Sequence, residues 1–186
     1  MKRAIFLSVL LVSGIVHAAT IDLRASSGKM KFLAIGKPAM LRIGGEGSGP
    51  EGKIAIDNKK VSGELKVDLR SLNTGIDLRD EHMKNKYLEV GSYPTATLTL
   101  NSFELAKAPA EIEGKLDGQK FTGTLAFHGI SKPVEGVFDV EADGKNLNVK
   151  AKYSVKLSEF NIDIPAYAGL KVADKVDIET SFTVLK

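Results

Sequence analysis

Three side chains that can carry charge lie within one turn of the sequence, at Arg79, Asp80 and His82. In an enzyme, such a carboxylate and imidazole at the mouth of a pocket could work as an acid and base pair. The same residues equally suit a scaffold in which Arg79 pairs with a carboxylate and Asp80 caps the turn. The sequence supplies no recognisable nucleophile or oxyanion motif beside them. We therefore predict a structural turn, with a hydrolase-type polar centre as the alternative.

Metal and cofactor sites find little support in the residue types. Cysteine is absent, which removes disulfides and thiolate ligands. Beyond the first 18 residues the histidines are His82 and His128, and their spacing supplies no recognisable zinc site. Residues 47–52 have the glycine spacing of a dinucleotide-binding loop, yet a strand-like run follows where that loop requires a helix. The sequence predicts no metal and no cofactor.

A short helix is expected to carry the charged turn. Residues 79–90 place Met83, Tyr87 and Val90 at helical spacing, which gives the helix one apolar face. Asp77 can cap its first turn, and a glycine and a proline follow its last residues. No other segment after the N-terminal region has a convincing helical period. A single helix therefore lies among strands.

Most of the remaining chain alternates apolar and polar residues, the period of half-buried strands. Asp117-Gly118 and Asp143-Gly144 have the form of two-residue hairpin turns, so consecutive strands are expected to be antiparallel neighbours. Residues 39–43 could form a strand, whereas residues 44–52 are so rich in glycine that they form either a loop or a sharply bent, twisted edge. The pattern predicts roughly eight to ten strands in an all-β sandwich or barrel.

The N-terminus has the features of a secretory leader. Lys2 and Arg3 precede an apolar run from Ala4 to Val16, and the residues up to Ala18 suit a signal peptidase. The run is shorter than the roughly 20 residues of a spanning helix, so no stable membrane anchor is expected. We predict a signal peptide over residues 1–18, one domain over residues 19–186, and a periplasmic location.

Net charge restricts the class of partner. The chain has 26 Lys and Arg residues against 23 Asp and Glu residues. Removal of Lys2 and Arg3 with the leader leaves a net charge near +1. This balance argues against a partner held by neutralised phosphates. We therefore expect no nucleic acid as a partner.

Three stretches resemble the recurring motifs of the YceI-like family of periplasmic polyisoprenoid-binding proteins. The first is Asn73-Thr74-Gly75, then Arg79-Asp80-x-His82-Met83, then Tyr87-Leu88-x-Val90-x-x-Tyr93-Pro94. The second is Phe121-x-Gly123-x-Leu125-x-Phe127-His128-Gly129-Ile130-x-Lys132-Pro133-Val134. Phe160-Asn161-Ile162 and residues 172–178 resemble the family's C-terminal segment. Together they cover most of the chain after the leader, in the order of the family.

The resemblance implies an all-β fold, an antiparallel eight-stranded lipocalin-like barrel with the helix of residues 79–90 at its mouth. It also implies a non-catalytic protein that sequesters or transports a polyisoprenoid, a quinone precursor or a similar lipid. Such a chain needs a deep apolar tunnel with polar groups only at the mouth. A filled structural barrel with no ligand is the alternative, because periodicity cannot separate a packed interior from a lined one.

The apolar faces of the expected strands and helix supply the candidate ligand-binding lining. Its residues are Phe32, Leu65, Val67, Leu69, Met83, Tyr87, Leu98, Leu100, Phe121, Leu125, Phe127, Phe138, Val140, Tyr153, Val155 and Phe182. Charged head groups of a ligand would meet Lys37, Lys132 or Lys171. The expected partner is a hydrophobic isoprenoid or quinone-like lipid. The sequence leaves open whether the protein forms a homodimer.

Overall fold

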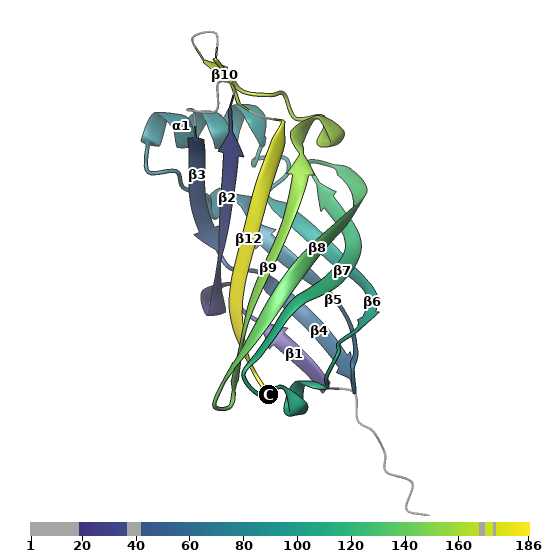
Figure 1. Cartoon of the computed structure of the whole chain (residues 1–186). Helices are drawn as coiled ribbons and strands as arrows, with labels where there is room; N and C mark the ends of the chain where they lie inside the picture. Colours follow the sequence, from purple (N-terminus) through teal and green to yellow (C-terminus); the bar gives the residue numbers. More distant parts are fainter. Residues whose placement is uncertain (1–18, 37–41, 168–169, 173) are drawn as a thin grey trace, which may run out of the picture.

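The chain folds around one curled antiparallel sheet. The computed structural model describes residues 19–36, 42–167, 170–172 and 174–186. The predicted signal peptide, residues 1–18, lies outside the described residues. Ten strands curl into a half-barrel, and the helix lies beside one end of it (Figure 1). We call this the upper end, and the end that carries the C-terminus the lower end.

The sheet has neighbours in the order β1-β4-β5-β6-β7-β8-β9-β12-β2-β3. In chain order its strands are β1 (Ala19–Leu23), β2 (Gly28–Ile35), β3 (Arg42–Ser48), β4 (Glu51–Asp57), β5 (Lys60–Asp68), β6 (Thr95–Glu104), β7 (Lys115–Phe127), β8 (Ile130–Asp143), β9 (Asn146–Lys156) and β12 (Lys175–Leu185). A separate two-stranded ribbon pairs β10 (Ala166–Tyr167) with β11 (Leu170–Lys171). The helical segments are η1 (Ala25–Ser27), η2 (Leu69–Ser71), α1 (Asp77–Glu81), η3 (His82–Tyr87), η4 (Pro109–Glu111) and η5 (Leu157–Phe160).

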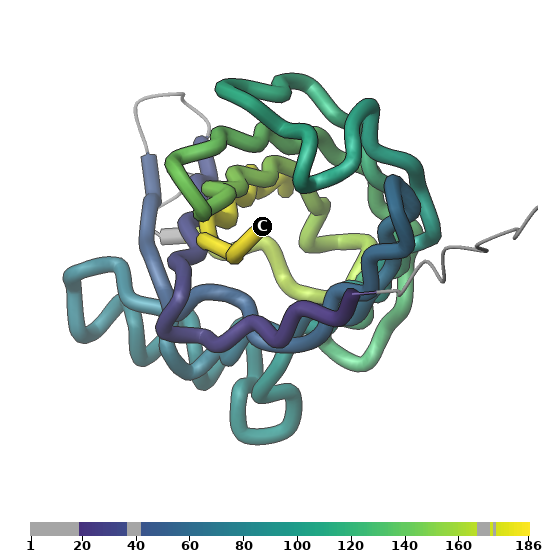
Figure 2. The backbone as a smooth tube through the Cα atoms, turned by 90° about the horizontal axis from the view of Figure 1, so that it is seen from below, coloured from purple at the N-terminus to yellow at the C-terminus, as the bar shows by residue number. Residues whose placement is uncertain are grey.

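The antiparallel all-β prediction is confirmed, and the count of eight strands is wrong. Figure 2 shows the strands curling round the interior when the molecule is seen along its length. The ladder is open, because β1 pairs only with β4 and β3 pairs only with β2 within the main sheet of the described chain. The ten-stranded sheet therefore stays open, with β1 and β3 as its edge strands.

Most of the glycine-rich segment lies in the edge strand β3, one of the two alternatives for residues 44–52. Its residue Glu46 exchanges two backbone hydrogen bonds with Asn73, of 2.9 and 2.8 Å. A Cβ atom at Gly45 would lie 2.6 Å from the Asn73 carbonyl oxygen, and one at Gly47 would lie 2.8 Å from the Ser71 hydroxyl. Glycine lets β3 approach this segment closely. Residues 37–41 lie outside the described chain.

One of the two predicted hairpin turns is confirmed. Asp143 pairs with Asn146 across a two-residue turn between β8 and β9. Asp117-Gly118 instead lies inside β7, where the register with β8 shifts, and the Gly118 amide donates to the Asp139 carboxylate at 2.8 Å. The Asp-Gly pair marks a β-bulge at this position, because the positive φ of Gly118 is compatible with a bulge as well as with a turn.

The single helix is shorter than residues 79–90 and starts earlier. It runs through α1 and one π-helical turn, η3, and ends at Tyr87. Asp77 is its first helical residue and not its N-cap, because the cap position belongs to Ile76 and has no side-chain hydrogen bond. Leu88 caps the end of η3, and Glu89 then adopts a φ of 45°, which turns the chain out of the helix; Leu88 and Val90 on either side are buried.

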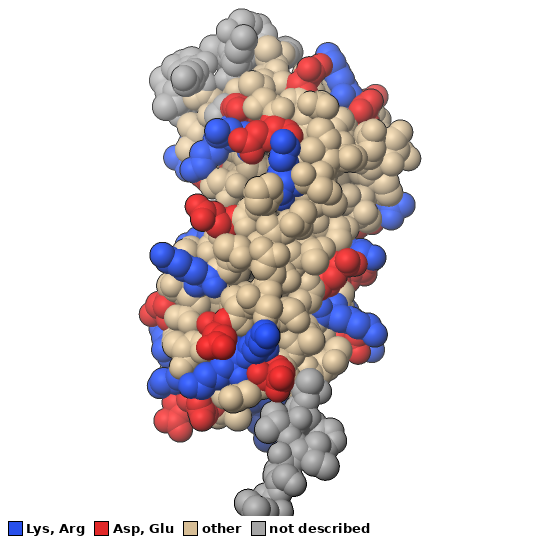
Figure 3. All heavy atoms as spheres, turned by 90° about the vertical axis from the view of Figure 1, so that its right-hand side faces the viewer, with Lys and Arg blue, Asp and Glu red and all other residues tan. Residues whose placement is uncertain are grey.

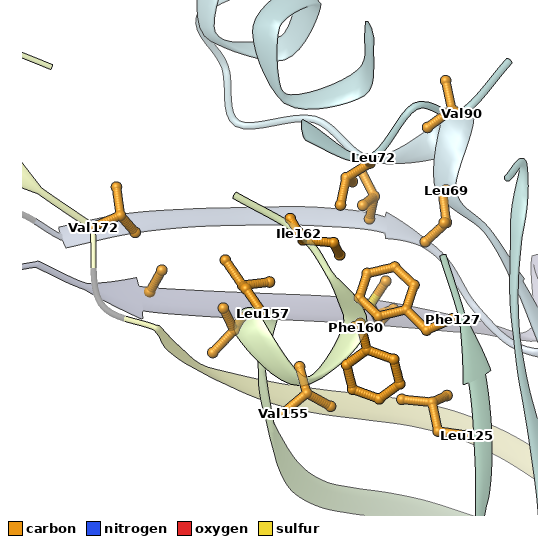
Figure 4. Packing of buried hydrophobic residues seen from close by; sticks show 14 residues of the cluster. Leu69, Leu72, Val90, Leu125, Phe127, Val155, Leu157, Phe160, Ile162 and Val172 are labelled. Carbon is orange, nitrogen blue, oxygen red and sulfur yellow. The ribbon is translucent and has the colours of Figure 1, made fainter. Parts of the chain in front are cut away.

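Two hydrophobic clusters fill the interior, one toward each end. The upper cluster brings together residues from η2, the segment after η3, β7, β9 and η5, and Figure 4 shows their side chains converging between the strands. Its most buried member is Phe160, which is 1% exposed and packs 5.3 Å from the Phe127 ring. In the lower cluster Ile112 is equally buried, at 1%. Side chains from the connecting segments therefore complete both clusters.

Candidate ligand cavity

The interior of the upper half holds a cavity of about 220 Å³. Its wall is apolar except for Thr74, Arg79, Thr180 and two tyrosines. Thirteen of the sixteen predicted lining residues lie on this wall: Phe32, Leu65, Val67, Leu69, Met83, Tyr87, Leu98, Phe121, Leu125, Phe127, Tyr153, Val155 and Phe182. We call this the upper cavity.

A second apolar cavity of about 110 Å³ lies in the lower half. The remaining predicted residues, Leu100, Phe138 and Val140, line this lower cavity and not the upper one. Five residues border both cavities, and we call their level the waist: Leu65, Leu98, Phe121, Ala151 and Phe182. The two cavities therefore follow one another inside the curled sheet.

Strand register explains why the predicted residues converge. Leu98 pairs with Leu65 on one side and with Leu125 on the other, so inward positions of three neighbouring strands share one level. Because successive side chains of a strand alternate between faces, the polar residues between these positions face outward. Period-two alternation in the sequence was sufficient to find this part of the wall.

Other wall residues gave no periodic signal. Ile43 lies in the glycine-rich strand β3, and Ile162 and Val172 lie in irregular segments after η5. Figure 4 shows Ile162 and Leu157 reaching the upper cluster from this side. Residues in irregular segments have no fixed spacing, so only the tertiary fold reveals them.

Thr74 joins Arg79 and Asp80 in one hydrogen-bond network at the upper cavity. The Arg79 guanidinium donates to the Thr74 hydroxyl and to its carbonyl, each at 2.8 Å. The buried Asp80 carboxylate accepts from the Thr74 amide at 2.8 Å and from its hydroxyl. The prediction that Arg79 pairs with a carboxylate is wrong, and Asp80 does fix the turn. His82 is exposed and forms no hydrogen bond with either residue in the described chain.

His128 connects three segments at the upper end. Its Nδ1 lies 3.0 Å from the Phe160 carbonyl oxygen and its Nε2 lies 2.9 Å from the Glu89 carboxylate. Both partners are acceptors, so both contacts are hydrogen bonds only when the imidazole carries two protons. The Tyr93 ring packs 4.5 Å from the imidazole ring. His128 therefore ties the β7–β8 turn to η5 and to the segment after η3.

Among the described residues, Arg79 is the one charged side chain that lines the upper or the lower cavity. Lys132 is exposed and lines neither cavity, and Lys37 and the side chain of Lys171 lie outside the described part. Figure 3 shows charges of both signs interspersed around a wide uncharged stretch on the face at the right of Figure 1. That face offers no single-sign patch of the kind that holds nucleic acid.

The described residues contain no group of three or more His, Cys, Asp or Glu side chains placed to hold a metal ion. None of their helices is long and apolar enough to cross a membrane.

Comparison with known proteins identifies relatives of the whole described domain. Residues 20–184 match the YceI-like domain family. A UPF0312 protein of Pectobacterium atrosepticum is 27% identical over 122 residues, 60% of this chain and 59% of its own. A UPF0312 protein of Yersinia pestis is 26% identical over 122 residues, again 60% of this chain and 59% of its own. The match thus spans about three fifths of these curated relatives.

Solved structures share the fold. The structure of a polyisoprenoid binding domain from Saccharophagus degradans aligns with a TM-score of 0.63 and 19% identity, covering 90% of this chain and 98% of that one. Burkholderia cenocepacia BcnA aligns with a TM-score of 0.67 and 19% identity, covering 88% and 99%. The YCEI protein of Campylobacter jejuni has a TM-score of 0.56 at 16% identity, covering 100% and 93%. At these sequence identities, the comparison shows that the proteins share a fold.

Proposed function

The chain belongs to the YceI-like domain family, and from this premise we propose that it binds a polyisoprenoid, a quinone precursor or a similar lipid in the upper cavity. The observation that supports the proposal is the cavity itself, about 220 Å³ of interior space behind an almost wholly apolar wall. Each methylene moved from water to such a wall contributes about 0.8 kcal/mol. A few isoprene units would therefore bind tightly without covalent chemistry.

The lipid class rests on the family and on one structural relative. The domain from Saccharophagus degradans that shares the fold is described as a polyisoprenoid binding domain. The present wall offers what such a chain needs, since it is apolar along its length and its one charged residue, Arg79, lies on the helix at the upper end. The predicted lining residues of the upper cavity would make the contacts.

We propose that the protein sequesters or transports its ligand and does not catalyse a reaction. Arg79 and Asp80 both direct their hydrogen bonds to Thr74, which occupies the groups that a hydrolase would need for proton transfer. His82 is exposed on the helix and does not line the cavity. With the leader of residues 1–18, the proposal places this binding in the periplasm.

Filling the cavity tests the proposal. Ala96 lies on the wall of the upper cavity, and Ala96→Phe would occupy space that the ligand needs. Ala126 is exposed on the neighbouring strand, where it pairs with Thr97, so Ala126→Phe is a matched control outside the barrel. Uptake of a radiolabelled isoprenoid is expected to fall at least about 10-fold in Ala96→Phe, a loss of about 1.4 kcal/mol, and to persist in Ala126→Phe. Equal uptake by all three proteins would refute binding in this cavity.

A further inference from the structure

Two hydroxyl groups lie in the apolar wall close to the waist. Tyr153 projects inward from β9 and Thr180 from the neighbouring strand β12, and both line the upper cavity. Tyr153 pairs with Ile178 and Ala151 pairs with Thr180, so the two hydroxyl-bearing residues are diagonal neighbours on one face of the sheet. Their level contains the waist residue Ala151, which borders both cavities.

Neither hydroxyl has a hydrogen-bond partner among the described residues, although Thr180 is only 8% exposed. No fully enclosed side-chain nitrogen or oxygen of the described chain lacks a partner, so both hydroxyls retain some accessible surface. For inward residues on the cavity wall, that surface faces the cavity. A hydroxyl buried without a partner costs about 1–3 kcal/mol, so its place in an apolar wall needs a compensating contact.

The surroundings define what that contact would be. Burial raises the pKa of Tyr153 to about 12, so its hydroxyl stays neutral and can donate. No charged side chain of the described residues lines the cavities at this level, and an ionised group would be costly there. The Phe121 ring meets the Tyr153 ring edge-on at 6.2 Å, which keeps the neighbourhood apolar. The site suits a single uncharged oxygen acceptor.

We propose that Tyr153 and Thr180 form a polar subsite that hydrogen-bonds an uncharged oxygen on the ligand, deep inside the tunnel. The inference rests on the proposed function and adds to it the chemistry of the ligand. The protein would prefer an isoprenoid chain that bears a carbonyl, ether or hydroxyl oxygen over a pure hydrocarbon. This subsite differs from the expectation that polar groups contact the ligand only at the mouth of the tunnel.

A matched pair of ligands tests the subsite. Squalene and squalene epoxide have the same carbon skeleton and differ by one oxygen. The wild-type protein is expected to bind the epoxide about 2- to 10-fold more tightly, the gain of one buried hydrogen bond. Tyr153→Phe and Thr180→Val each remove a hydroxyl with little change in shape, and each is expected to reduce the preference for the epoxide over squalene.

Controls separate this inference from the proposed function. Tyr93→Phe removes the same atom from a tyrosine that lines neither cavity, and it should keep the preference. Thermal melting of each variant shows that it folds. If the wild type binds both ligands equally, or if both variants keep the preference, the subsite is refuted and the lipid-binding proposal stands. If the wild type binds neither ligand, both fail.

Discussion

The upper and lower halves of the interior share five strands but differ in what fills them. In the lower half, the Phe138 ring lies 5.6 Å from Phe103 and 6.4 Å from Phe121, and aromatic packing leaves about 110 Å³ of space. In the upper half the cavity is about 220 Å³, although β5, β6, β7, β9 and β12 contribute to both walls. Alternation of apolar and polar residues along a strand therefore produces an apolar wall in both halves, whether the interior is packed or hollow.

Connecting segments explain the difference between the halves. Ile112, which directly follows η4, fills the lower end and is 1% exposed. At the upper end, η5 places Phe160 against Phe127 at the side of the cluster, while Leu157 and Ile162 line the space that remains. We infer that the lower half serves as a packed base and that the upper half holds the ligand.

The largest effect is expected from Ile112→Ala in the packed base. Truncation of a fully buried isoleucine costs about 2–5 kcal/mol, because it removes apolar contacts and leaves a void. The free energy of unfolding, measured with denaturant, is expected to fall by this amount. Isoprenoid affinity of the folded protein should stay unchanged, and a parallel loss of affinity would contradict the division into two halves.

A smaller effect is expected where the helix meets the upper cavity. Asp80→Ala removes the acceptor of two Thr74 hydrogen bonds, and leaving such groups unpaired costs about 1–3 kcal/mol. Asp77→Ala is the matched control, because Asp77 is exposed in the same helix and should change stability by at most about 0.5 kcal/mol. Denaturant unfolding compares the two. Equal effects would show that the Thr74 network does not hold the upper end.

His128 offers a test of how the upper end is held together. His128→Asn keeps a residue that tolerates the φ of 50° and loses the reach to the Phe160 carbonyl and Glu89. We expect a loss of about 1–2 kcal/mol in unfolding free energy. Faster amide hydrogen exchange should be confined to η5, the β7–β8 turn and the segment after η3. Faster exchange in the lower half as well would show that the two halves are not independent.

The smallest effect concerns pH. Hydrogen bonds from the Ser158 amide and then from its hydroxyl hold the pKa of Asp174 below its ordinary value of 3.8. A lowered pKa in the folded state gives stability that is present above 3.8 and is lost as the pH falls through the folded value. Asp174→Ala should therefore be about 1 kcal/mol less stable than the wild type at neutral pH. Denaturant titrations should show that the difference in unfolding free energy between the two proteins becomes smaller in acid. A difference that stays constant with pH would contradict the role given to the Asp174 carboxylate.

The sequence predicted the strand residues that line the interior better than the helix and irregular segments that close its ends. Period two located inward residues such as Leu98 and Val155, because strand geometry is local. The helix was found from its apolar stripe, yet its bounds were wrong because Glu89 turns the chain in a left-handed conformation. Ile162 was missed, since no spacing rule applies to irregular chain. The role of Thr74 was also missed, because its two partners meet it only in the folded turn.

Native mass spectrometry of the full-length protein, purified from a bacterial periplasm without detergent, tests the central claim most directly. Gentle ionisation followed by organic extraction identifies any lipid that dissociates. We predict one bound isoprenoid-type molecule per chain in the wild type and in Ala126→Phe, and none in Ala96→Phe. An empty wild-type protein that also fails to take up added isoprenoid would contradict the claim and favour a filled structural barrel.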